Sequence, residues 1–152
     1  MYRRLYRRLY RRLYRRLYRP SERHPQAHAT VCGWALVADT HEEATHHGLG
    51  RERWRVDRAR GIFGPLQAPD VIAARGFSAD EMPTIEAMRA KAFVGTSEEV
   101  ETKLRALARQ FDLAEIVVNT WAHEPSVRRH SYALLASAFR LSPAPSAEGS
   151  AR

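Results

Sequence analysis

Two kinds of hydrophobic spacing alternate along this chain, and each predicts a type of element. Residues 30–38 (TVCGWALVA) are almost continuously apolar, which is typical of a strand buried on both faces of a parallel sheet. Residues 114–120 (AEIVVNT) form a second, shorter apolar run. The pattern therefore predicts two short strands, separated by about 75 residues of different character.

An amphipathic helix is predicted before the second strand and another after it. Thr96 and Glu99 have the spacing of a capping box, and the apolar positions that follow recur at helical intervals. They are Val100, Leu104, Leu107, Ala108 and Phe111. The last helix opens at Glu124-Pro125, because proline is favoured in a first helical turn. Its predicted inner face is Val127, Ser131, Leu134, Leu135, Ala138 and Phe139.

The stretch that follows the first strand has a weaker pattern. Asp39 and Thr40 precede Glu42 and Glu43, and acids in a first helical turn suit the helix dipole. Glycines and prolines then punctuate residues 48–82. We expect an irregular excursion there, with one short helix near residues 51–60 and another at 81–91.

Strands alternating with amphipathic helices predict the α/β class, with right-handed βαβ units on a parallel sheet. The length of 152 residues suggests one domain. Two adjacent strands would leave two open edges. An isolated chain of this kind is expected to be marginally stable, oligomeric or prone to aggregation.

The N-terminus is a tandem repeat. Residues 2–17 read YRRL four times, and Pro20 ends a fifth copy that begins at Tyr18. A helix is predicted over residues 1–19, with an apolar stripe that drifts by about 40° per repeat and that could cover part of a sheet face. The Pro/Ala/Ser-rich tail from Ser142 is predicted to be disordered. The expected organisation is a basic helix over 1–19, a folded part over 20–141 and a tail over 142–152.

The charge of the chain resides in this repeat. Lys and Arg number 25 against 17 Asp and Glu, a formal net charge of +8, and nine of the arginines lie in residues 3–19. The remainder is close to neutral. One interpretation is that residues 2–19 bind nucleic acid or an anionic membrane. The other, favoured by the identity of the four copies, is tandem duplication of a coding unit.

Cysteine and hydropathy narrow the location. The single cysteine, Cys32, excludes an internal disulfide framework and a Cys-based zinc site. Its place in a strand predicts an inert, buried thiol. The sequence contains neither an 18-residue apolar run nor a secretory signal. A cytoplasmic protein is predicted.

Five short motifs, in order, resemble the C-terminal part of the luciferase-like flavin-dependent oxidoreductases, the bacterial luciferase-like monooxygenase family. They are Tyr18-Arg19-Pro20-Ser21-Glu22-Arg23, Val37-Ala38-Asp39-Thr40-His41-Glu42-Glu43-Ala44, Phe93-Val94-Gly95-Thr96-Ser97-Glu98-Glu99-Val100, Leu113-Ala114-Glu115-Ile116-Val117-Val118-Asn119-Thr120 and Arg129-His130-Ser131-Tyr132-Ala133-Leu134-Leu135-Ala136.

The resemblance implies a partial (β/α)₈ TIM barrel made of about its last two βα units, preceded by the repeat helix. It implies an FMN-dependent monooxygenase, an oxidoreductase in which reduced FMN activates oxygen and a small organic substrate is oxidised. Most of the loops that hold the flavin phosphate in this family have no counterpart here. The isolated chain is therefore expected to be truncated and incomplete, to pair with itself or with a complementing barrel fragment, or to be an inactive barrel fragment.

Candidate site residues follow from the rule that (β/α)₈ enzymes place their active sites at the C-terminal ends of the strands. Here these ends carry Thr40 on one side and Asn119 and Thr120 on the other, which are the cofactor-binding candidates. Trp121 could lie against a flavin or substrate, and His123 could move protons. These two are the catalytic candidates. The alternative is that Thr40, with Asp39, caps a helix and that Trp121 packs on the rim.

The histidines at 41, 46 and 47 lie close to Glu42 and Glu43. A spacing of five separates His41 from His46 around a helix, unlike the i, i+4 pair of the H-E-x-x-H motif. We predict no metal site.

Overall fold

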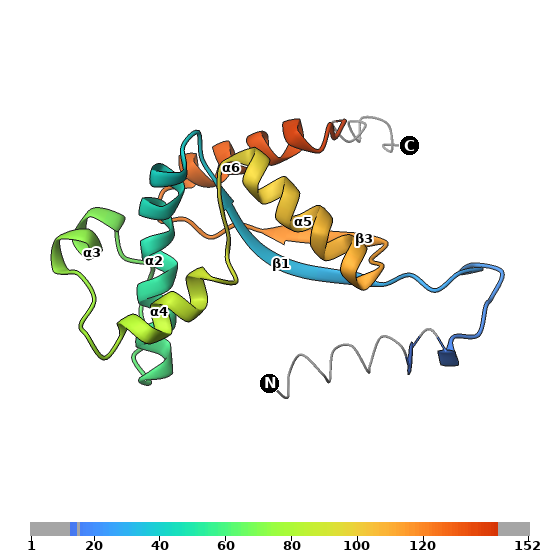
Figure 1. The fold of residues 1–152 in the computed structure, drawn as a ribbon, viewed down its shortest axis with the longest axis horizontal. Coiled ribbons are helices and arrows are strands. Elements are labelled where there is room, and N and C mark those ends of the chain that lie inside the picture. Colours follow the sequence, from blue (N-terminus) through green and yellow to red (C-terminus); the bar gives the residue numbers. More distant parts are fainter. Residues whose placement is uncertain (1–12, 15, 143–152) are drawn as a thin grey trace, which may run out of the picture.

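The computed structural model describes residues 13, 14 and 16–142, and within them three parallel strands lie among helices (Figure 1). The strands are β1 (Thr30–Val37), β2 (Phe93–Gly95) and β3 (Glu115–Asn119), in the order β2-β1-β3. The predicted α/β class with a parallel sheet is confirmed. The predicted number of strands was wrong, because β2 was not recognised.

The central strand pairs with its neighbours over different halves. Ala35, Leu36 and Val37 of β1 are in register with Phe93, Val94 and Gly95 of β2. The first half of β1, from Thr30 to Trp34, is in register with the whole of β3. A strand of three residues is too short to show a period, so only its pairing with β1 identifies β2.

Burial along β1 differs from the prediction. Residues 35–37 are almost completely buried, but Thr30 and Cys32 are exposed. The predicted burial on both faces therefore holds only for the C-terminal half of the strand. The prediction of a buried Cys32 was wrong, because its side chain lies on a face that the described helices leave open.

Helix α2 (His41–Ala59) runs unbroken for 19 residues. A helix with Glu42 and Glu43 in its first turn was expected, but as an element separate from the short helix near 51–60. Glycines suggested a break, but both glycines of α2 are buried and Gly50 marks a close approach of the backbone. A Cβ on Gly50 would lie 3.0 Å from the Gln67 carbonyl oxygen, and one on Gly48 would lie 4.0 Å from Val94 Cγ1. Gly50 thus allows the loop that contains Gln67 to approach α2. This contact offsets the free-energy cost of a glycine inside a helix.

The other helices are α3 (Pro69–Arg75), α4 (Met82–Arg89), α5 (Ser97–Phe111) and α6 (Pro125–Ala138). The predictions for α4, α5 and α6 are confirmed, whereas α3 was not predicted. The Thr96 side chain caps α5, and Glu99 completes the predicted capping box.

The sheet has one face that is well covered. Helices α5 and α6 pack there, and the core joins Ala35 and Val37 to Val100, Leu104 and Leu135. On the opposite face Leu36 is fully buried near α2, but Val117 is 46% exposed. The N-terminal half of the sheet is therefore covered on one face only.

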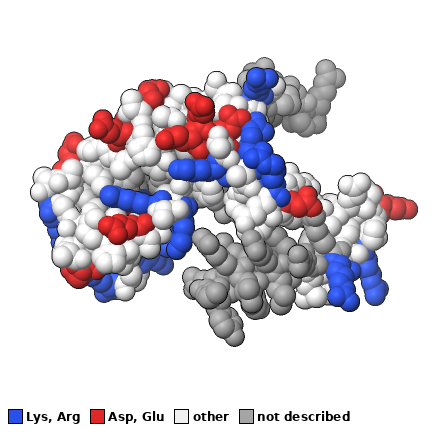
Figure 2. All heavy atoms as spheres, in the orientation of Figure 1, with Lys and Arg blue, Asp and Glu red and all other residues white. Residues whose placement is uncertain are grey.

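The predicted repeat helix lies mostly outside the described residues, as does the tail beyond residue 142. Leu13, Tyr14 and Leu17 are helical and exposed. The described end of the repeat, blue in Figure 1, lies apart from the sheet. The described part of the repeat does not provide the expected cover over a sheet face. On the face of the described residues that Figure 2 shows, acidic and basic side chains are intermixed.

None of the helices in the described ranges has the length and apolar character needed to cross a membrane.

Candidate functional site

Two buried hydroxyl groups, on Thr120 and Ser131, form hydrogen bonds at the C-terminal end of β1. Thr120 is 2% exposed, and its Oγ1 donates to the Ala35 carbonyl oxygen at 2.9 Å. Its backbone N–H donates to Tyr132 Oη at 3.0 Å. From α6, the buried Ser131 Oγ accepts from the Val37 N–H at 2.9 Å. Thr120, predicted as a cofactor ligand, therefore holds the strand ends together.

The other two cofactor-binding candidates have different surroundings. Thr40 is the N-cap of α2, and its Oγ1 accepts from the Glu43 N–H at 3.1 Å. This is the capping alternative considered above. Asn119 is exposed at the end of β3, in register with Trp34. Of the three, Asn119 alone presents a polar side chain that no described contact occupies.

Trp121 and His123 follow Thr120 and pack against the excursion. The Trp121 ring meets the Trp54 ring of α2 edge-on, with centroids 5.2 Å apart, and remains 37% exposed. His123 Nδ1 lies 3.0 Å from the Leu66 carbonyl oxygen. A carbonyl only accepts, so Nδ1 carries the proton. Nε2 lies 3.5 Å from Glu124 Oε1. Trp121 thus packs on the rim, as the structural alternative predicted, and part of its ring remains accessible.

Two His–carboxylate pairs, which the sequence did not reveal, lie beside the strand ends. His41 Nδ1 is 2.9 Å from Glu99 Oε2, and His130 Nε2 is 2.9 Å from Asp39 Oδ2. The hydrogen bond from His41, aided by the Thr96 N–H, holds the pKa of Glu99 below its ordinary value. Gly95 has φ of +143° and any Cβ there would meet the Glu99 carboxylate. These pairs involve α5 and α6, on the helix-covered side of the sheet.

The other two histidines of the 41, 46 and 47 group contact separate carboxylates. His46 Nε2 is 3.0 Å from Asp70, and His47 Nε2 is 3.7 Å from Glu43. Among the described residues, no three His, Cys, Asp or Glu side chains converge as metal ligands. Cys32 is exposed on the uncovered half of the sheet.

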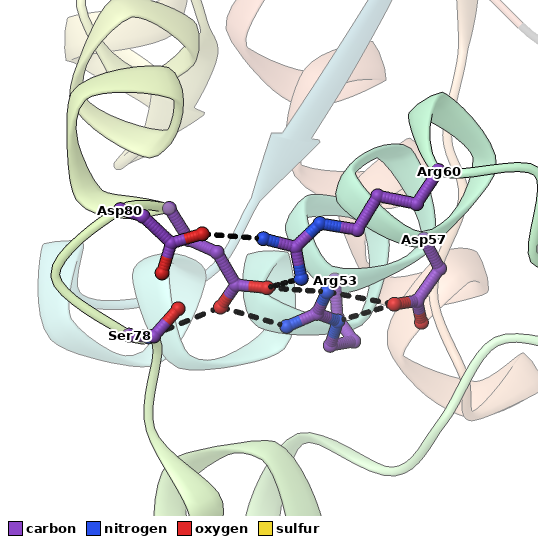
Figure 3. A network of polar contacts seen from close by, with 6 residues as sticks. Arg53, Asp57, Arg60, Ser78 and Asp80 are labelled. Atoms are coloured by element: carbon purple, nitrogen blue, oxygen red, sulfur yellow. Dashed lines mark hydrogen bonds and ion pairs between the residues drawn. The ribbon is translucent and has the colours of Figure 1, made fainter.

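A buried ionic network joins α2 to the segment at the start of α4 (Figure 3). Arg53 is 1% exposed, and its two terminal nitrogens donate to the two Glu81 oxygens at 3.0 and 2.9 Å. Arg53 Nε also donates to Asp57 at 2.9 Å, while Arg60 donates to Glu81 at 2.6 Å and to Asp80 at 2.7 Å. This bidentate pairing fixes the start of α4 against α2.

The pKa values of the paired groups indicate that this network has a structural role at neutral pH. Arg53, followed by the Ser78 N–H, lowers the pKa of Glu81 from 4.5 to about 2. The same pairing raises the pKa of Arg53. Both groups stay charged, so neither is suited to proton transfer near pH 7. Sequence alone could show only the i, i+4 spacing of Arg53 and Asp57.

A pocket of about 550 Å³ lies between α2, α4 and the Trp34 side of β1. Its lining includes Arg51, Arg55 and Lys91 and contains no acidic residue. The Arg51 guanidinium lies over the Trp34 ring, 4.0 Å from its centroid. The sequence alone does not reveal this pocket, because its walls come from three segments that are distant in the chain.

Fold and strand-end geometry define the chain as an α/β protein with a parallel sheet. Comparison with known proteins adds two relatives from Bacillus subtilis strain 168, both called uncharacterized. YwcH is 34% identical over 114 residues, which cover 73% of this chain and 34% of YwcH. YvbT is 27% identical over 115 residues, covering 76% of this chain and 34% of YvbT. The chain thus spans about a third of each relative. No family model matches.

A solved structure has a similar fold. The crystal structure of apo-MsnO8 superposes with a TM-score of 0.74 and 21% sequence identity. The superposition covers 90% of this chain and 42% of the MsnO8 chain.

Proposed function

We propose that residues 20–141 form the closing part of a luciferase-like, FMN-dependent (β/α)₈ oxidoreductase, with β1 and β3 as its last two barrel strands. The observation that carries this proposal is the asymmetric sheet. One face is covered by α5 and α6, whereas Thr30, Cys32 and Val117 lie exposed on the other. A barrel strand has helices outside and close-packed side chains inside. The exposed half-sheet is suited to such an interior.

The proportions of the matches support this proposal. The relatives are about three times as long as the matched segment, and MsnO8 has more than half of its chain outside the superposition. A barrel of this type needs roughly 250 residues. The last two strands of such a barrel, with their helices, would make up a part of it similar in proportion to the part of each relative that this chain matches.

The side chains at the strand ends fit only part of a flavin site. Asn119 and the accessible part of Trp121 offer an amide and an aromatic surface. The hydroxyls of Thr40 and Thr120 are occupied by helix capping and strand pairing. Among the described residues, no arginine or lysine side chain forms a hydrogen bond or an ion pair with Thr40, Asn119 or Thr120 that could also hold a phosphate there. The proposal therefore assigns the chain one wall of the site, while flavin would supply the redox chemistry.

A chimera with YwcH tests the proposal. The matched 114-residue segment of YwcH is replaced by the corresponding segment of this chain. FMN binding is then measured by flavin fluorescence for YwcH, for the chimera and for YwcH that lacks the segment. We expect YwcH and the chimera to bind FMN with dissociation constants within about tenfold, which is about 1.4 kcal/mol. The shortened protein should not bind.

The possible failures can be distinguished. If YwcH itself does not bind FMN, the flavin assignment is wrong. If YwcH binds FMN and a chimera with a cooperative melt does not, this chain is an inactive barrel fragment. The isolated chain should leave FMN fluorescence unchanged, and stoichiometric quenching by it would contradict the incomplete site.

A further inference from the structure

The pocket between α2 and α4 is electrostatically one-sided. Arg51 and Arg55 enter it from α2, and Lys91 enters from the segment before β2. Within the part of the chain that the structure describes, none of the three forms an ion pair. A neighbouring arginine, Arg89, instead pairs with an acid, Glu52, at 2.8 Å. No acidic side chain in the lining therefore balances the positive charge of the pocket.

Arg51 is positioned for binding. Its guanidinium stacks on Trp34 at 4.0 Å, which orients the planar group while leaving its N–H edges unoccupied. Burial, and then the charge of Arg55, lower the pKa of Arg51 to about 10. The group stays protonated at neutral pH, and an anion nearby would relieve both effects.

The rest of the lining is largely apolar. Met88, Pro83 and Ala87 of α4 and Phe93 of β2 contribute hydrocarbon and aromatic surface, and Thr84 adds a hydroxyl. Such a site favours a ligand with one charged end and an apolar body. The volume of about 550 Å³ is within the range of small-molecule sites.

We propose that this pocket binds a small organic carboxylate, with its charged end at Arg51, Arg55 and Lys91 and its apolar part against α4. This binding site does not depend on the flavin proposal, since every residue that forms it belongs to the described chain. A guanidinium matches a carboxylate through two parallel hydrogen bonds. Lys91 would add a point charge at the entrance.

The test uses the full chain and the indole N–H resonance of Trp34, identified by its loss in Trp34→Phe. Hexanoate, hexanamide and acetate are titrated separately. We expect a saturable shift with hexanoate, at least tenfold tighter than with either other probe. Equal binding of hexanamide would overturn the role of the cations. Equal binding of acetate would overturn the role of the apolar wall, and no shift with hexanoate would overturn the site.

Variants locate the charged end. Arg51→Gln/Arg55→Gln should weaken hexanoate binding at least tenfold. Arg109→Gln/Arg128→Gln removes two exposed arginines from α5 and α6 and should leave binding unchanged. If the first double variant loses its native spectrum, Lys91→Gln at an exposed position serves instead, with about threefold weaker binding expected. Undiminished binding in the pocket variants would contradict the assignment.

Discussion

The two halves of β1 share one strand and differ in their surroundings. From Ala35 to Val37 the strand lies between β2 and the covering helices and is almost fully buried. From Thr30 to Trp34 it pairs with β3 and is covered on one face only. The apolar character of both halves is similar, so the difference lies in what packs against them.

The exposures of Leu36 and Val117 show this difference most clearly. Both lie on the same face of the sheet, because Val117 is in register with Cys32, and Cys32 and Leu36 are an even number of residues apart. Leu36 is 0% exposed and Val117 is 46% exposed. Helix α2 is in contact with β1, whereas no described element covers Val117 to a similar extent.

The largest effect is expected from Leu36→Ala. Removing a fully buried leucine side chain should lower the free energy of unfolding by about 3 kcal/mol. Val117→Ala, on the same face, should lower it by less than about 1 kcal/mol. Urea unfolding followed by circular dichroism measures both. Equal losses would mean that the open half-sheet is covered in solution, for example by a second copy of the chain.

Two Arg–Glu bridges extend the comparison to α2. Arg53–Glu81 is buried, whereas Arg89–Glu52 joins the same helices with the arginine side chain 40% exposed. Arg53→Met leaves two carboxylates without this partner and should cost about 3 kcal/mol. Arg89→Met should cost about 0.5 kcal/mol. Similar unfolding free energies for the two variants would show that burial does not strengthen the inner bridge.

Acid should weaken the inner bridge selectively. The folded pKa of Glu81 is about 2 against an ordinary value of 4.5, so its ionised form stabilises the fold at neutral pH. This contribution is complete above pH 4.5 and declines as the pH falls through about 2. The stability difference between the wild type and Arg53→Met should therefore narrow between pH 5 and roughly pH 3. A difference that is constant over this range would contradict the assignment.

Thr120→Val tests the junction between the two halves. It removes the hydrogen bond to the Ala35 carbonyl and leaves a buried acceptor without this partner. The expected loss is about 1–2 kcal/mol. Thr40→Val at the exposed cap of α2 should cost about 1 kcal/mol or less. Thermal melts of the two variants, compared with the wild type, measure the difference.

The smallest effect is expected at Cys32. Cys32→Ser should change the free energy of unfolding by less than about 0.5 kcal/mol, since the side chain is exposed. In the native wild type, the thiol should react with a disulfide reagent at a rate near that of the unfolded chain. Strong protection would show that this face is occupied.

Long periodic segments were predictable, and short or remote pairings were not. The helix over residues 97–111 followed from its capping box and its apolar spacing. The strand at 93–95 has no period of its own and forms only because β1 offers it an edge. At the candidate site, Thr40 caps a helix and Trp121 packs on the rim, which are the structural alternatives to their predicted functional roles. The Arg53–Glu81 pair joins residues 28 positions apart, and the pocket lining extends from Trp34 to Phe93. No local pattern reveals contacts over such separations.

By itself the sequence determined the alternation of strands and helices, the capping of α5 and the confinement of excess charge to the repeat, because these depend on neighbouring residues. Only the tertiary structure decided which half of β1 is buried, which hydroxyls are occupied and which cations share a pocket. Those properties depend on contacts between distant segments, and the free energy of a contact depends on burial and on the partners that surround it.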